Sequence, residues 1–176
     1  MQGLIMPFKG RMPKLGQGVF IAPTAAVIGD VEIGDDSSLW FGVTVRADVH
    51  EVRIGSNTNI QDGSVVHVTG GKFGTYIGSN VTIGHGAIIH ACTLEDGAFV
   101  GMGAIILDGA VVEGGSMVAA GAVVTPGKRV KRGEMWAGSP AKLLRTISED
   151  EIKAFAWSAP HYVDLKNDYL AQARTR

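Results

Sequence analysis

Aliphatic residues recur at every sixth position through most of this 176-residue chain, and this period constrains its fold more than any other feature. The register of the series shifts three times, yet a small or β-branched residue always stands two positions before the aliphatic one. A period of six predicts a short strand followed by a tight turn, and three such strands make one triangular coil. We therefore predict an all-β solenoid, a parallel β-helix of about five to six stacked coils. The aliphatic positions are Ile21, Val27, Ile33, Leu39, Val45, Ile54, Ile60, Val66, Ile77, Ile83, Ile89, Leu94, Val100, Ile106, Val112, Val118 and Val124.

The repeat divides the chain into four parts. We expect an N-terminal lead-in at 1–18, the β-helix at 19–126, a linker containing the segment AGSPAK at 127–147, and a C-terminal α-helical segment at 148–176. Ser148 and Glu151 have the spacing of a capping box, which predicts a helix start, and a second helix is expected to begin at Ser158. The apolar stripe of this second helix is incomplete, so it is expected to pack along the solenoid or on a neighbouring chain.

Composition excludes several classes of partner. The chain has 16 basic and 17 acidic residues and a formal charge of -1, which gives no reason to expect nucleic acid or an anionic membrane surface as a ligand. Cys92 is the single cysteine, so no disulfide can form within the chain, and it is interpreted as the small residue of its repeat. No stretch is apolar for long enough to serve as a signal peptide or a membrane span. We expect a cytoplasmic protein that acts on a small molecule.

Three of the five histidines lie close together in the sequence. His67 follows Val66 and His90 follows Ile89, so the two occupy the same position on adjacent coils, with backbones about 4.8 Å apart. Two outward-facing imidazoles at that spacing can share a tetrahedral metal ion. His85 lies on the preceding face, up to about 16 Å away along a strand, and cannot readily reach the same ion within one prism. This spacing suggests a homotrimer in which His85 of one chain completes a metal site on its neighbour.

Further polar residues surround the histidines in the predicted coils. Arg46 and Asp62 are expected to form an ion pair across the interface between chains, and Gln61 carries an amide able to orient a metal-bound water. Three neutral histidines leave one coordination position open, as in catalytic rather than structural zinc sites. We therefore expect Zn²⁺ as cofactor, although imidazole ligands also permit Fe²⁺ or Co²⁺.

The segments WFGVTVRADV, NIQDGSVVH and GHGAIIH resemble the γ-class carbonic anhydrases and their γ-carbonic-anhydrase-like relatives, a hexapeptide-repeat family. The resemblance implies that the β-helix is left-handed, that the protein is a trimer, and that it hydrates carbon dioxide reversibly to bicarbonate. It implies that zinc is held by His67 and His90 of one chain and His85 of the next. The other residues that it places at the site are Asn59, Gln61, Asp48 and Tyr162, with Arg46 and Asp62 as a trimer contact.

The sequence departs from the most active members of that family at the proton exit. Those members carry a glutamate directly after the residue matched by Asp48, where this chain has Val49, and a further glutamate in an acidic loop. The segment VHEVR offers only His50 and Glu51 as replacements, so slow proton transfer is expected. His50 and His161 are otherwise interpreted as surface histidines.

Two other functions remain open from the sequence. Many hexapeptide-repeat proteins are acyltransferases, so a coenzyme A-dependent acyltransferase or thioesterase is the first alternative, with a histidine as general base. The second is a non-catalytic, metal-binding trimeric scaffold whose zinc ties the chains together.

Overall fold

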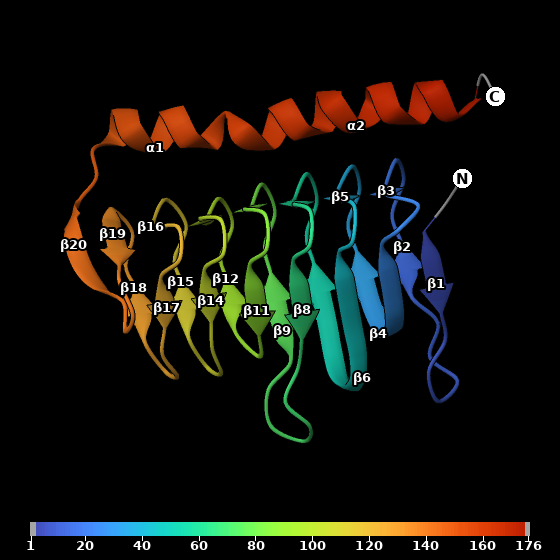
Figure 1. The fold of residues 1–176 in the computed structure, drawn as a ribbon, viewed down its shortest axis with the longest axis horizontal. Helices are drawn as coiled ribbons and strands as arrows, with labels where there is room; N and C mark the ends of the chain where they lie inside the picture. Colours follow the sequence, from blue (N-terminus) through green and yellow to red (C-terminus); the bar gives the residue numbers. More distant parts are fainter. Residues whose placement is uncertain (1–2, 175–176) are drawn as a thin grey trace.

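The computed structural model describes residues 3–174, and they form a triangular solenoid with a helical segment along one side (Figure 1). We number the three faces in the order in which β4, β6 and the following strands cross them. Faces 1 and 2 together make a 12-stranded sheet, because β4 and β6 bend round the corner between them, and face 3 is an 8-stranded sheet. Neighbouring coils pair in parallel throughout, and β19 and β20 alone are antiparallel among the described strands.

The strand boundaries follow the predicted period. Face 1 contains β1 (Leu4–Met6), the first parts of β4 (Ala26–Ile33) and β6 (Thr44–Ile54), β8 (Val65–His67), β11 (Ile88–His90), β14 (Ile105–Ile106) and β17 (Val123–Val124). Face 2 contains β2 (Lys14–Leu15), the last parts of β4 and β6, β9 (Thr75–Ile77), β12 (Thr93–Leu94), β15 (Val111–Val112) and β18 (Arg129–Val130). Face 3 contains β3 (Phe20–Ile21), β5 (Ser38–Leu39), β7 (Asn59–Ile60), β10 (Thr82–Ile83), β13 (Phe99–Val100), β16 (Met117–Val118), β19 (Glu134–Ala137) and β20 (Lys142–Thr146).

The solenoid is longer than the sequence predicted. It makes about seven turns rather than five to six, because the predicted lead-in supplies β1 and β2 and the predicted linker supplies β18 and β19. These segments continue the ladder of backbone hydrogen bonds although they lack the regular aliphatic period. The solenoid therefore extends beyond 19–126 at both ends, and AGSPAK forms the turn between β19 and β20.

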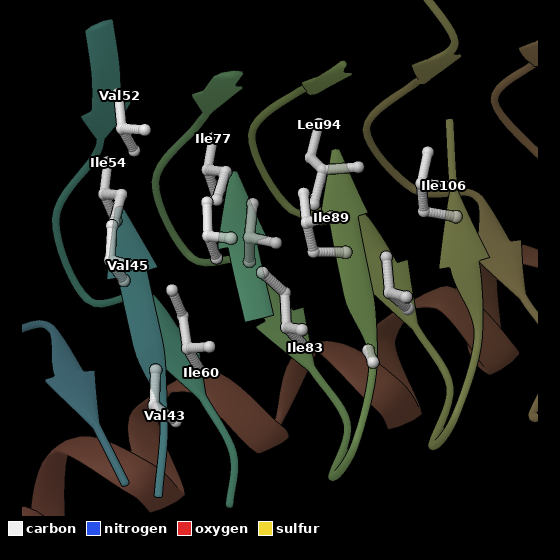
Figure 2. Packing of buried hydrophobic residues seen from close by; sticks show 14 of the residues in the cluster. Val43, Val45, Val52, Ile54, Ile60, Ile77, Ile83, Ile89, Leu94 and Ile106 are labelled. Atoms are coloured by element: carbon white, nitrogen blue, oxygen red, sulfur yellow. The ribbon is translucent and has the colours of Figure 1, made fainter. Parts of the chain in front are cut away.

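The aliphatic residues of the repeat fill the interior of the prism (Figure 2). Val45, Val66, Ile89, Ile106 and Val124 are register partners on successive coils of face 1, and all are fully buried. Full burial of one such side chain contributes about 1.5–3 kcal/mol to folding. This stacked core fixes the register of every coil, and with it the position of each residue that follows a core residue.

The C-terminal segment folds back along the solenoid. Helix α1 (Glu149–Ala156) begins with the predicted capping box, in which the Ser148 hydroxyl accepts a hydrogen bond from the Glu151 amide and the Glu151 carboxylate accepts one from the Ser148 amide. Helix α2 (Ser158–Arg174) follows after Trp157 and runs over face 3 to the N-terminal end of the solenoid (Figure 1). Positions 175 and 176 of the predicted helical segment lie outside the described residues, as do positions 1 and 2 of the lead-in.

Helix α2 is anchored by a buried lysine. The Lys166 side chain is fully buried, and its ammonium group donates hydrogen bonds to Asp36 at 2.7 Å and to Asn167 at 2.8 Å. Asp36 lies in the left-handed conformation, with φ of 57°, which aspartate and asparagine tolerate better than most residues. An asparagine at this position would therefore remove the charge without changing the backbone.

We predict that Asp36→Asn loosens the docking of α2. The buried ammonium loses its ionic partner, and a buried charged donor that is poorly satisfied costs about 1–3 kcal/mol. Hydrogen exchange should show faster opening of α2 but unchanged protection of β11 and β14. Asp164→Asn, the same change at an aspartate that lies on α2 itself, serves as the control, and equal exchange rates in the two variants would contradict the prediction.

Candidate metal centre

His67 and His90 meet at the corner between faces 1 and 2. They end β8 and β11 and are register partners, as the period predicted. The distance from His67 Nδ1 to His90 Nε2 is 3.2 Å. Two nitrogens bound to one tetrahedral ion at 2.0–2.1 Å are about 3.3 Å apart, so the spacing fits a shared metal.

A carboxylate holds the other nitrogen of each ring. Asp48 Oδ1 lies 3.1 Å from His67 Nε2, and Asp108 Oδ1 lies 2.8 Å from His90 Nδ1. An ionised carboxylate can only accept hydrogen bonds, so each ring directs its N–H to its aspartate. With both rings neutral, the two nitrogens that face each other are unprotonated, and a cation between them would satisfy both lone pairs. Carboxylate–histidine–metal arrangements of this kind are typical of metal sites in proteins.

Both carboxylates are held in the ionised form. Burial opposes ionisation of Asp48, but hydrogen bonds from His67 and Arg46 outweigh it and lower the pKa. The Thr69 hydroxyl and then His90 lower the pKa of Asp108 against a burial effect of opposite sign. Asp108 was missed by the sequence analysis. Asp108 lies 18 residues after His90, which is one coil further along the prism, and this spacing could have placed it beside His90.

The third histidine lies at the opposite edge of face 1. His85 precedes β11, at the corner between faces 3 and 1, and its Nδ1 lies 2.9 Å from Asp62 Oδ2. Gln61 is nearby, and its amide donates to Asn59 at 3.0 Å. A depression of about 290 Å³ beside these groups is lined by Gln61, His85, Phe99, Met102 and Met117, among others.

Tyr162 reaches this second edge from helix α2. Burial, followed by the nearby charge of Asp62, raises the pKa of the tyrosine hydroxyl, so it is protonated at neutral pH. Its ring contacts Trp40 edge-on, with centroids 5.4 Å apart. These contacts place Tyr162 with the Asp62 group and not with the His67 pair.

The predicted site residues therefore fall into two groups. The first edge carries Arg46, Asp48, His67 and His90, and the second carries Asn59, Gln61, Asp62, His85 and Tyr162. Within residues 3–174 no group of three or more histidine, cysteine, aspartate or glutamate side chains is arranged to hold a metal ion. In one chain Arg46 pairs with Asp48, and Asp62 pairs with His85. The predicted contact between Arg46 and Asp62 of different chains stays a prediction.

The two shuttle candidates differ in their surroundings. The Glu51 carboxylate accepts from Arg53 at 2.8 Å and from the Tyr76 hydroxyl at 2.9 Å, so both of its oxygens are engaged. His50 accepts a hydrogen bond from the Glu51 amide through Nδ1, and both candidates line a cleft of about 510 Å³ together with Asp48. Because no hydrogen bond from the described residues engages its Nε2, His50 is the better placed of the two to exchange protons beside the first edge.

Cys92 is unsuited to chemistry. It is buried in the core, and burial raises the pKa of its thiol far above the usual range. The thiol is therefore protonated at physiological pH and packs as the small residue of its repeat.

The repeat and its parallel coils define a hexapeptide-repeat β-helix, and the family model described as bacterial transferase hexapeptide (six repeats) matches residues 12–47. Gamma carbonic anhydrase 2, mitochondrial, from Arabidopsis thaliana is 50% identical over 92% of this chain, which spans 60% of that relative's length. Carbonic anhydrase from Geobacillus kaustophilus is 36% identical, with 98% of this chain and 94% of the relative covered. The chain belongs to the γ-carbonic-anhydrase-like family of hexapeptide-repeat proteins.

Solved structures agree with this fold. The crystal structure of a hexapeptide transferase family protein from Anaplasma phagocytophilum is 49% identical, with a TM-score of 0.91 and with 96% of this chain and 99% of that chain covered.

In the described part of the chain, neither helix has the length and apolar character needed to cross a bilayer.

Proposed function

We propose that this protein is a zinc-dependent, homotrimeric carbonic anhydrase that hydrates carbon dioxide reversibly at three sites between its chains. The division of the site residues between the two edges of face 1 carries the proposal. A metal held by His67 and His90 needs a third protein ligand, and His85 lies at the wrong edge of its own chain to provide it. A neighbour packed against face 1 brings its His85 edge to the paired histidines, and a closed ring repeats the contact three times.

The outward surface of face 1 favours such packing. The outward-facing residues that pair with one another from coil to coil on this face are mostly apolar. Two of them next to the site, Val65 and Ile88, are 39% and 38% exposed. The corresponding row of face 2 is largely charged and polar, and face 3 is covered by helix α2. Exposed apolar surface is what an oligomer buries, so face 1 is the face expected at the interface. The face 1 row is Leu4, Ala26, Thr44, Val65, Ile88, Ile105 and Val123, and the face 2 row is Lys14, Glu32, Arg53, Tyr76, Thr93, Val111 and Arg129.

The chain's own residues then have distinct tasks. Bound zinc supplies Lewis acidity that lowers the pKa of a coordinated water from 15.7 to about 7. His67 and His90, oriented by Asp48 and Asp108, and the neighbour's His85 would hold the ion. Gln61, fixed by Asn59, presents an amide beside His85 to orient the reacting molecule. His50 carries protons from the cleft to solvent. Imidazole nitrogens also suit Fe²⁺ and Co²⁺, so the same site accepts these ions.

Acyl transfer from coenzyme A is a second candidate, favoured by the likeness to a hexapeptide transferase family protein. It would use one of the histidines as a general base. The aspartates behind His67 and His90 leave the nitrogens that face each other as the available ones, which suits a shared metal better than a base. Turnover of acetyl-coenzyme A that survives thorough metal removal would favour the acyltransferase.

Hybrid trimers test whether the site lies between chains. We predict that His85→Ala and His67→Ala proteins are each inactive in zinc-dependent hydration of carbon dioxide, measured by stopped flow. Co-expressed with different tags and purified through both, the hybrids should regain about a third of the wild-type activity, because each hybrid ring restores one of its three sites. A site formed within one chain would give no recovery.

A control and a contrary outcome complete this experiment. In the control, His85→Ala chains with one tag are co-expressed with His85→Ala chains with the other tag. These hybrids should have no activity, because every chain lacks the same ligand. If the mixed hybrids bind zinc again without any hydration activity, the carbonic anhydrase proposal fails and the protein is a metal-binding scaffold.

A further inference from the structure

We infer that Thr69 and Asp108 are positioning residues that hold His90 in its metal-binding orientation, which makes the loop at 68–74 part of the metal site. The inference rests on the proposed function, because it concerns how the chain prepares the same zinc site. Neither residue belongs to the set predicted from the sequence.

The contacts of Asp108 leave it little freedom. One carboxylate oxygen accepts from His90 Nδ1 at 2.8 Å, and the other accepts from the Thr69 hydroxyl. With both oxygens engaged on different coils, the carboxylate cannot rotate without breaking one bond. Because Asp108 accepts from Nδ1, the Nε2 lone pair of His90 is left to face His67.

The loop that supplies Thr69 is itself closed. Thr69 and Phe73 exchange two backbone hydrogen bonds, of 3.0 and 3.2 Å, at the base of the loop that projects between β8 and β9 (Figure 1). At this base the Phe73 ring also lies against Gly109, where an added Cβ would be 3.5 Å from the ring. The loop therefore bridges from the coil of His67 to the coil of Asp108, which lies beyond His90.

The end of the loop is tied to both histidine strands. The Thr75 hydroxyl donates to the His67 carbonyl and accepts from the Ala91 amide at 2.9 Å. Ala91 adopts the left-handed conformation directly after His90, with φ of 51°. Thr75, the first residue of β9 after the loop, thus contacts the backbone of His67 and of the residue that follows His90. Thr69 reaches the His90 side chain through Asp108.

The test is zinc affinity, measured by chelator competition on the assembled protein. Loss of an outer-shell partner costs about 10- to 100-fold in metal affinity, so Asp108→Asn should weaken zinc binding by that factor. Thr69→Val removes only the hydroxyl hydrogen bond and should weaken it about 3- to 10-fold, while Thr69→Ser keeps the bond and should restore wild-type affinity. Asp96→Asn is the matched control, because Asp96 also accepts a structural hydrogen bond, from Ser79 at 2.7 Å, far from the histidines.

A second readout separates positioning from general stability. In the metal-free protein, nitrogen NMR should show the Nδ1–H tautomer of His90 in the wild type and a shifted tautomer population in Asp108→Asn, but no change in Asp96→Asn. Wild-type affinity and tautomer in both Asp108→Asn and Thr69→Val would overturn the inference. His67→Ala is measured in parallel. If this variant also keeps wild-type zinc affinity, the proposed metal site itself is wrong. If His67→Ala alone loses zinc binding, only the positioning role is refuted.

Discussion

His85→Ala is expected to abolish zinc-dependent carbon dioxide hydration while leaving the fold of each chain intact. His85 lies on an exposed turn, and its side chain is 47% accessible in the single chain, so alanine removes little packing. The lost imidazole is a direct ligand in the proposed site. We expect a fall in kcat/KM of at least about 100-fold, since even an outer-shell partner is worth about 10- to 100-fold. Stopped-flow hydration assays on protein reconstituted with zinc measure it.

The matched control is His161→Ala. His161 stacks on Trp157, with ring centroids 4.5 Å apart, and lies edge-on to the Tyr162 ring at 5.7 Å. Among the interactions of the described residues it contacts none of the three proposed metal ligands. This variant should keep wild-type hydration. If His85→Ala binds zinc and hydrates carbon dioxide at the wild-type rate, the third ligand is another residue and the proposed arrangement of chains is wrong.

Leu94→Ala should cause a large loss of stability. Leu94 is 1% exposed on β12 and stacks between Ile77 and Val112 on the neighbouring coils. Both neighbours are held by their own ladders, so they cannot collapse into the space, and a buried Leu→Ala change of this kind costs about 2–5 kcal/mol. Urea denaturation monitored by circular dichroism should report this decrease in the free energy of unfolding.

Leu144→Ala provides the comparison with identical chemistry. Leu144 lies on the edge strand β20 and is 63% exposed, so its truncation should change the free energy of unfolding by less than about 0.5 kcal/mol. Equal losses in the two variants would show that the coil interior tolerates cavities and that the stacked core is not what fixes the register.

Much of the candidate site could be predicted because the solenoid converts sequence period into position. His67 and His90 could be placed on adjacent coils since each follows a core residue of the same face, and the structure confirms their register. The same argument placed His85 at another corner. The number of turns was underestimated, because the terminal coils are held by backbone pairing and carry an irregular side-chain pattern.

The sequence by itself determined the triangular coil, the stacked core and the pairing of His67 with His90. A period of six allows only one register in which all the aliphatic side chains are buried. Only the tertiary structure decided which oxygens face which nitrogens. Thr69 and Asp108 are 39 residues apart and meet because an irregular loop folds back across the coils, a path that no periodic pattern encodes. The same holds for the ion pairs at the two edges of face 1, where Arg46 lies against Asp48 and His85 against Asp62, because the spacing along the chain does not specify which side chains pair.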